Sequence, residues 1–117
     1  MAEKTTDPPI ICLCGSTRFK PTWERETRRL TLAGFIVLGV GSYPHYGHDL
    51  TLEEKARMDE LHKRKIDLAG SVLVLDVDGY IGESTRSEIE YAEAHGKPVH
   101  YLSKRQENAR TGGKEHG

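Results

Sequence analysis

The chain has 117 residues and a formal net charge of −1, and this length suits one domain. Lys and Arg number 17 against 18 Asp and Glu, so the basic excess by which proteins bind nucleic-acid polymers is missing. No apolar run is long enough to cross a bilayer, and the polar first residues lack the apolar core of a signal peptide. We therefore expect a cytoplasmic protein that binds neither membranes nor nucleic acids.

Short apolar runs alternate with helix-like stretches along the chain. We expect strands over residues 10–14, 35–40, 71–76 and 98–102, and helices over 19–33, 51–69 and 85–95. This alternation predicts a doubly wound parallel sheet of four to five strands in a single three-layer α/β domain. The domain spans residues 9–102, between polar tails over 1–8 and 103–117 that we expect to be flexible. In such sheets, ligands bind beyond the carboxyl ends of the strands.

Two cysteines, Cys12 and Cys14, lie in the first predicted strand, where side chains two residues apart point to the same face. The rise of a strand holds their α carbons too far apart for easy disulfide formation. We therefore expect two small buried side chains, no disulfide and a reducing compartment.

The first candidate site follows that strand directly, at Gly15-Ser16-Thr17-Arg18. Glycine permits a tight turn, the two hydroxyls and the free N–H groups of the next helix can bind an anion, and the planar guanidinium of Arg18 suits phosphate. An ordinary strand-to-helix turn with an N-cap would use the same residues. The position at a strand end and the arginine favour an anion site.

The second candidate site joins the third strand to the third helix, and its polar residues and glycines are denser than a connection needs. Its members are Asp76, Asp78, Gly79, Tyr80, Gly82, Ser84, Thr85, Ser87 and Glu88. Thr85 and Glu88 have the spacing of a capping box, which is one interpretation of the glutamate. In the other, Glu88 is a carboxylate that the helix dipole keeps ionised in the ligand crevice, where it can attack a sugar. Asp76 and Asp78 could instead cap turns.

The second predicted helix carries a histidine on its apolar face. The buried stripe is expected to contain Met58, Leu61, Ile66 and Ala69, and His62 falls within it. A histidine in this position is either a core residue with its hydrogen bonds satisfied or a group that handles protons.

The loop before that helix is rich in tyrosine and histidine. Tyr43 and Tyr46 could stack on a base beside the crevice. His45 and His48 lack a third ligand nearby, which is weak support for zinc. We therefore expect a binding loop, with no metal and no cofactor.

Residues 87–99 resemble the signature of the nucleoside 2-deoxyribosyltransferase superfamily: a glutamate, a residue pair, Tyr-Ala, a short helix end, Gly-Lys and a strand. Thr85 also fits a threonine common in that signature. The turn from Gly15 to Arg18 resembles the phosphate-binding turn of the 2′-deoxynucleoside 5′-phosphate N-hydrolases in the same superfamily. The matched pieces span residues 10–102.

The resemblance implies a flavodoxin-like sheet, cleavage of an N-glycosidic bond and an oligomer, either a homodimer or a larger assembly. It assigns Glu88 as the nucleophile on the anomeric carbon, and Ser16 and Arg18 as ligands of a 5′-phosphate, with Ser84 or Ser87 also reaching it. His62 stands where these families have an aspartate that contacts the sugar or helps to protonate the base. Asp59 lies one turn earlier, so either residue takes that role, or the activity differs.

Three hypotheses follow for the function. The first is hydrolysis of a nucleoside 5′-monophosphate, with the base against Tyr43, Tyr46 or Tyr80 and with proton donation by Asp76, Asp78, Asp59 or His62. Transfer of the sugar to a second base is a variant of the same chemistry. The second hypothesis is a nucleotide-binding or sensor module without catalysis, and the third is cleavage of NAD at its nicotinamide bond.

Overall fold

The computed structural model describes residues 7–44 and 49–105 of the chain, and these contain one sheet of four parallel strands. The strands are β1 (Ile10–Cys14), β2 (Ile36–Leu38), β3 (Ser71–Val74) and β4 (Val99–Tyr101), and the helices are α1 (Lys20–Leu32), α2 (Leu52–Leu68) and α3 (Glu83–Ala94). Two short 3₁₀ turns, η2 (Thr17–Phe19) and η4 (Val77–Gly79), follow β1 and β3. None of the described helices is long and apolar enough to span a membrane.

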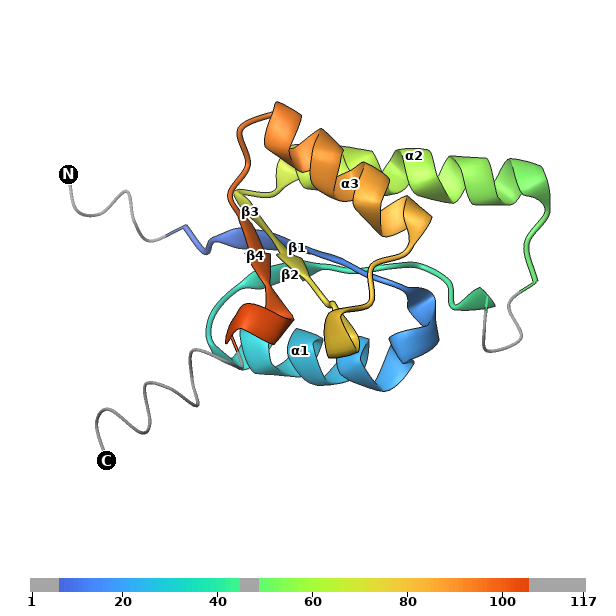
Figure 1. The fold of residues 1–117 in the computed structure, drawn as a ribbon. Coiled ribbons are helices and arrows are strands. Elements are labelled where there is room, and N and C mark those ends of the chain that lie inside the picture. The colour runs from blue at the N-terminus through green and yellow to red at the C-terminus, as the bar shows by residue number, and fades with distance from the viewer. Residues whose placement is uncertain (1–6, 45–48, 106–117) are drawn as a thin grey trace.

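The strand order is β2-β1-β3-β4, with α1 on one face of the sheet and α2 and α3 on the other (Figure 1). The predicted three-layer α/β domain is therefore confirmed, and it is Rossmann-like. The chain runs outward from β1 to β2 and then returns to place β3 on the other side of β1. This reversal leaves a crevice beyond the carboxyl ends of β1 and β3, which is where doubly wound sheets bind ligands.

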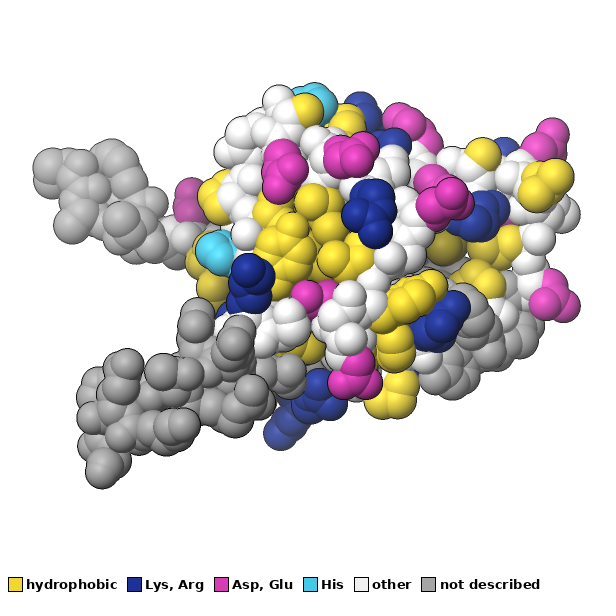
Figure 2. Space-filling model, in the orientation of Figure 1, with side chains coloured by type: hydrophobic (Ala, Val, Ile, Leu, Met, Phe, Trp, Pro, Cys, Tyr) yellow, Lys and Arg dark blue, Asp and Glu magenta, His cyan; other side chains and the backbone are white. Residues whose placement is uncertain are grey.

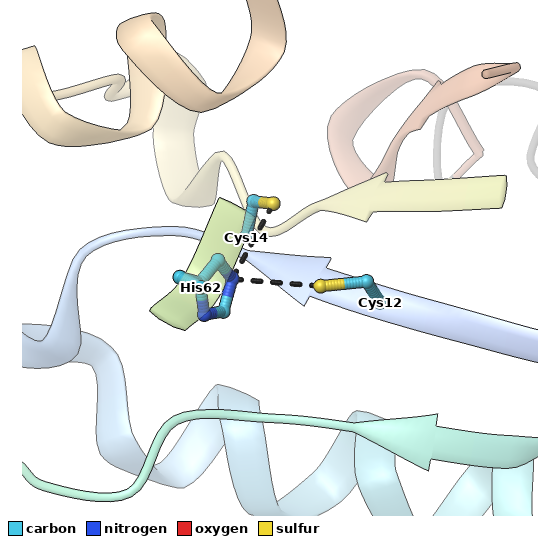
Figure 3. Close-up of side chains that lie close together, drawn as sticks. All are labelled: Cys12, Cys14 and His62. Atoms are coloured by element: carbon cyan, nitrogen blue, oxygen red, sulfur yellow. Dashed lines mark hydrogen bonds between the residues drawn. The ribbon is translucent and has the colours of Figure 1, made fainter. Parts of the chain in front are cut away.

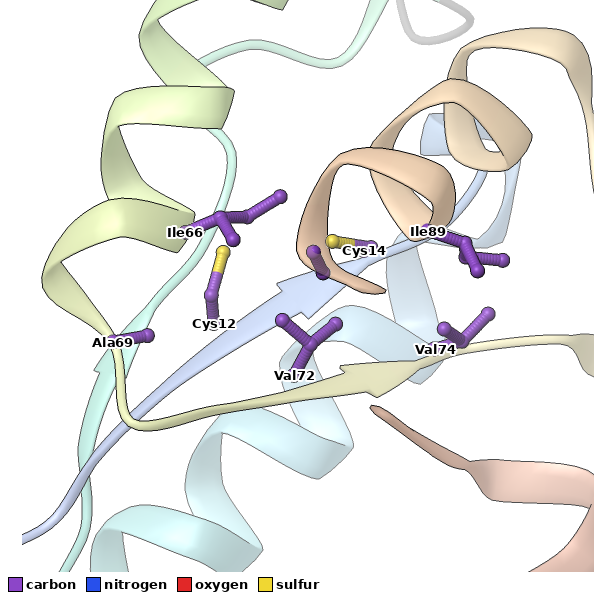
Figure 4. Packing of buried hydrophobic residues seen from close by; sticks show 8 residues of the cluster. Cys12, Cys14, Ile66, Ala69, Val72, Val74 and Ile89 are labelled. Carbon is purple, nitrogen blue, oxygen red and sulfur yellow. The ribbon is translucent and has the colours of Figure 1, made fainter. Parts of the chain in front are cut away.

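Alternate side chains of β1 and β3 build two separate cores. On the α1 face, Leu13 and Leu73 pack with Trp23 in one buried cluster. On the other face, Cys12, Cys14, Val72 and Val74 pack with Ile66 of α2 and Ile89 of α3 (Figure 4). Both thiols are fully buried and unbridged, as the sequence predicted.

The helix α2 begins as predicted. Thr51 is its N-cap, and the Thr51 and Glu54 side chains each accept a hydrogen bond from the other residue's backbone N–H, at 3.0 and 2.9 Å. The expected buried stripe is only partly right. His62 and Ile66 are buried, whereas Leu61 is 52% exposed. Leu61 precedes His62 by one residue, and a helix turns by about 100° per residue, so the two point in different directions.

The helix α3 begins earlier than predicted, with Gly82 as its N-cap and Glu83 as its first residue. The capping-box interpretation of Thr85 and Glu88 is therefore wrong, because both residues lie inside the helix and are buried. Glu88 is not held at the helix end, and its carboxylate lies on the inner face of α3.

The folded body continues past the boundary expected at residue 102. Leu102 is buried in the α1-face core, residues 102–105 form a helical turn, and Ser103 is hydrogen-bonded to Asp76. The rest of the two predicted tails, 1–6 and 106–117, lies outside the described residues.

Candidate active site at the carboxyl ends of β1 and β3

A cavity of about 270 Å³ lies at the carboxyl end of β1, between the turn that follows it, α2 and the start of α3. It brings together most of the residues that the sequence singled out: Gly15, Ser16, Thr17, Arg18, Asp59, His62, Tyr80, Gly82, Ser84, Thr85 and Glu88. These residues come from segments that are far apart in the sequence. The position agrees with the crevice expected of a doubly wound sheet.

The turn after β1 is held close to β3 by its glycine. A β carbon at Gly15 would lie 3.0 Å from the Cβ and 3.2 Å from the carbonyl oxygen of Leu75, which leaves no room for a side chain. The Ser16 hydroxyl accepts a hydrogen bond from the Arg18 N–H at 3.2 Å, and the Trp23 indole donates to the Ser16 carbonyl at 2.9 Å. Arg18 in turn lies over the ring of Tyr80, 4.5 Å from its centre. Contacts with Leu75, Trp23 and Tyr80 thus hold the turn and its arginine in place.

Glu88 lines this cavity, and its side chain is only 11% exposed. Burial raises the pKa of its carboxyl group, while the His62 imidazole and the Cys14 thiol act in the opposite direction. The expected contribution of the helix dipole is small, because α3 begins five residues earlier and the dipole acts mainly in the first turn. The protonation of Glu88 is therefore set by burial and by His62.

His62 occupies the centre of a buried cluster (Figure 3). Its Nε2 atom lies 2.8 Å from the Leu13 carbonyl oxygen, 3.5 Å from Cys12 Sγ, 3.6 Å from Cys14 Sγ and 3.9 Å from Glu88 Oε1. At 2.8 Å, the Nε2–H donates a hydrogen bond to the Leu13 carbonyl. Of the two roles predicted for His62, both remain open, since it is buried among partners and also reaches the cavity.

The contacts within this cluster shift the pKa of each member. Burial lowers the pKa of His62, but its contacts with Cys12 and Glu88 outweigh that effect and raise it. The hydrogen bond with Cys14 lowers the pKa of the Cys12 thiol, burial opposes this, and His62 lowers it further. The same hydrogen bond and burial raise the pKa of Cys14. The first of the two thiols to ionise is therefore Cys12.

A lysine that the sequence analysis missed bridges two walls of the cavity. Lys55 Nζ lies 3.1 Å from Asp59 Oδ2 within α2, and 3.1 Å from Ser84 Oγ at the start of α3. The signal was present in the sequence, because Lys55 precedes Asp59 by four residues and so shares its helix face. Lys55 adds a cation to the same cavity as Arg18.

Several predicted residues do not line this cavity. Asp76 is buried, and its carboxylate accepts hydrogen bonds from the Ser103 N–H at 2.9 Å and the Ser103 hydroxyl at 2.6 Å. Asp78 is exposed in the left-handed region of η4, with φ of 53°. Asp76 therefore holds residue 103 against the connection after β3 and does not cap η4 with its side chain, as the alternative interpretation expected. Asp78 forms part of that turn with its backbone.

Of the tyrosines predicted to contact a base, Tyr80 lines the cavity. Tyr43 instead makes an edge-on contact with Trp23 outside it, with ring centres 6.4 Å apart. Gly79 has φ of 79° and serves the turn of η4. Tyr46, His45 and His48 lie outside the described residues.

Ser87 lines a second cavity of about 330 Å³, which also borders Asp59, Lys63, Glu83, Ser84 and Glu88. Glu88 and Asp59 therefore border both hollows. A carboxylate with open space on two sides has room for a ligand that extends across it.

Within the described part of the chain, one group of side chains has the donor atoms and spacing of a metal site. It consists of Cys12, Cys14 and His62, whose ligand atoms all lie within 4.8 Å of one another. The sequence analysis expected no metal and considered only His45 and His48 as ligands. It did not connect His62 with the cysteines, the nearer of which is 48 residues away.

No family model, no curated protein and no solved structure matches this chain.

Proposed function

We propose that the protein cleaves the N-glycosidic bond of a nucleoside 5′-monophosphate and releases the free base and a sugar phosphate. The observation that carries the proposal is that Glu88, a buried carboxylate, lines the same cavity as the anion-suited turn from Gly15 to Arg18. The turn suits the phosphate of such a substrate, and Glu88 suits its anomeric carbon.

In this proposal the phosphate binds at the turn from Gly15 to Arg18. The turn offers two hydroxyls and a guanidinium held against Tyr80. Lys55 supplies a second positive charge from α2. A substrate without the phosphate would leave these cations unused, so monophosphates should react much faster than nucleosides.

The chemical step begins at Glu88. A carboxylate oxygen forms a bond to C1′ of the sugar as the bond from C1′ to the base nitrogen breaks, and the electron pair leaves with the base. A water molecule then attacks C1′ and passes one proton to the group that protonated the base, while the bond from C1′ to Glu88 breaks. This releases the sugar phosphate and restores the carboxylate. Burial shields the reacting carboxylate from bulk water, which strengthens every charge interaction around it.

The departing base takes up a proton, and two residues that line the cavity can donate one. They are His62, with Nε2 3.9 Å from Glu88 Oε1, and Asp59, one turn earlier on α2. Asp76 and Asp78 do not line the cavity and have no part in this proposal.

The test is a chromatographic assay of base release from ribo- and deoxynucleoside 5′-monophosphates, the matching nucleosides and NAD. Glu88→Gln should release no base, whereas the matched control Glu90→Gln, an exposed glutamate of the same helix, should behave as the wild type. Base release only when a second base is present would show that the protein is a transferase and not a hydrolase. Ligand-induced thermal stabilisation without any product would show that it is a binding module and not an enzyme.

The two proton donors can be separated with substrates whose bases differ in leaving ability. Removing the true donor, by His62→Gln or by Asp59→Asn, should slow poor leaving groups much more than good ones. An equal loss for all substrates would show that the altered residue binds substrate and does not donate the proton.

A further inference from the structure

The buried thiols beneath the candidate active site face a histidine from another element. Cys12 and Cys14 come from β1 and His62 from α2, and all three are less than 5% exposed (Figure 3). The carboxylate of Glu88, from α3, approaches the same imidazole nitrogen. Four side chains with metal-binding atoms thus converge from three elements of the fold.

The two separations from sulfur to nitrogen agree with tetrahedral zinc. Bonds of about 2.3 Å to sulfur and about 2.0–2.1 Å to nitrogen, at a tetrahedral angle, place the two ligand atoms about 3.5–3.6 Å apart. The two distances from Cys Sγ to His62 Nε2 are 3.5 and 3.6 Å. The Glu88 oxygen is 3.9 Å from the same nitrogen, about half an ångström beyond the tetrahedral separation of about 3.4 Å.

We propose that Cys12, Cys14 and His62 form a binding site for one zinc ion or a similar thiophilic divalent cation, with Glu88 as the fourth ligand. Two thiolates and an imidazole select this class of ion over magnesium or calcium, which prefer oxygen ligands. On binding, both thiols lose their protons, and the two thiolates balance the charge of the ion. The Glu88 carboxylate then leaves the liganded cluster with one net negative charge.

One existing interaction opposes the ion. The Nε2–H of His62 donates to the Leu13 carbonyl, and ligation at Nε2 exchanges this hydrogen bond for a bond to the metal. The Leu13 carbonyl then loses its buried donor, which opposes metal binding. Binding is therefore weaker than at a structural zinc site whose ligands have no other partners.

The site makes zinc an inhibitor of the proposed reaction. An ion held by His62 and Glu88 takes the lone pairs of the nucleophile and of one of the two proton donors. This consequence rests on the proposed function, whereas the presence of the site does not.

The primary test uses Co(II) in place of zinc, on the reduced full chain, and does not depend on turnover. The near-ultraviolet band of thiolate-to-cobalt charge transfer should rise to saturation at one equivalent of Co(II) and disappear when Zn(II) is added. Cys12→Ala should weaken metal binding by more than about tenfold, since even the loss of an outer partner costs that much. His100→Ala, an exposed histidine on β4, is the matched control and should bind as the wild type.

Absence of the charge-transfer band in the wild-type protein would overturn the site, and so would a band of full strength in a folded Cys12→Ala variant. Cys14→Ser provides a second variant if Cys12→Ala does not fold. An unchanged visible cobalt spectrum in Glu88→Gln would overturn Glu88 as the fourth ligand.

A separate measurement addresses inhibition. Zinc should abolish base release by the wild type, whereas Cys12→Ala should become insensitive to zinc, with the rate of each protein compared with its own metal-free rate. Equal sensitivity of the two proteins would overturn inhibition through this site. If no protein releases base, the cobalt spectrum still decides whether the metal site exists.

Discussion

The two faces of the sheet differ most at the carboxyl ends of β1 and β3. On the α1 face, Leu13, Leu73 and Leu75 keep the interior aliphatic to the ends of the strands. On the face covered by α2 and α3, the same strands end beside His62 and Glu88. The interior on the α1 face therefore contributes mainly stability, whereas the interior under α2 and α3 combines stability with reactive groups. On the exterior, Figure 2 shows charged side chains of both signs around an apolar surface patch.

The difference has an energetic reason. A buried polar group without a partner costs several kcal/mol, so polar groups inside a protein must satisfy one another. Among the described residues, every buried side-chain nitrogen and oxygen has a hydrogen-bond partner. The polar cluster is stable because its hydrogen bonds are complete, so only a substitution that conserves shape and polarity, such as Glu88→Gln, should affect chemistry more than folding.

Glu88→Gln should have the largest effect. The amide fits the same space but cannot attack C1′, so base release should fall by at least a factor of about 10³, equivalent to about 4 kcal/mol in the barrier. The free energy of unfolding should change by less than about 1.5 kcal/mol, because the substitution conserves volume. Assays of turnover and urea denaturation would check both values, and a large loss of stability would contradict the proposed division between the faces.

Leu73→Ala should have the opposite effects, a large loss of stability and little change in turnover. Leu73 is almost fully buried on the α1 face, and a cavity there should reduce the free energy of unfolding by about 2–5 kcal/mol. Turnover per folded molecule should stay near the wild-type value, since Leu73 lies outside the cavity wall. Calorimetry with activity measured well below the Tm would test this, and a selective loss of turnover would show that the two faces are coupled.

Asp76→Ala removes a second buried carboxylate, in the connection after β3, and should affect stability where Glu88→Gln affects turnover. The alanine leaves the Ser103 N–H and hydroxyl without their acceptor, so the protein should lose about 1–3 kcal/mol of stability. Amide hydrogen exchange should increase at residues 102–105, while base release should persist. Loss of turnover without faster exchange would return Asp76 to the list of catalytic residues.

Thr51→Ala should have the smallest effect, because it removes only the hydroxyl of an exposed cap on α2. A decrease of about 1 kcal/mol in the free energy of unfolding is expected. Ser84→Ala likewise removes one exposed hydroxyl, the partner of Lys55 in the cavity wall, and its effect on the free energy of unfolding can be compared with that of Thr51→Ala. A change well above 2 kcal/mol for Thr51→Ala would show that the start of α2 supports the site.

Local sequence patterns predicted the fold well because the interactions that produce it are local or periodic. The apolar runs marked all four strands, and Thr51 with Glu54 marked the start of α2. The same reasoning failed at α3, where the spacing of Thr85 and Glu88 imitated a cap that the chain forms at Gly82 instead. Such spacings occur inside helices as well as at their ends, so spacing alone cannot place a boundary.

The candidate site was predicted in its outline but not in its details. The turn at Gly15, together with Tyr80 and Glu88, was expected at the strand ends and does line one cavity. The role of Asp76 could not be predicted, because its partner Ser103 lies 27 residues away. Lys55 was overlooked although its spacing to Asp59 was visible in the sequence.

The amino-acid sequence by itself determined the class of fold, since alternating apolar runs and helical stretches have few other ways to bury their surface. It also determined which residue types follow each strand. Only the tertiary structure decided which of these share a cavity and that Cys12, Cys14, His62 and Glu88 form one buried cluster. The physical reason is that periodicity reports which way a side chain faces within its own element. The distances between elements follow from packing of the whole domain.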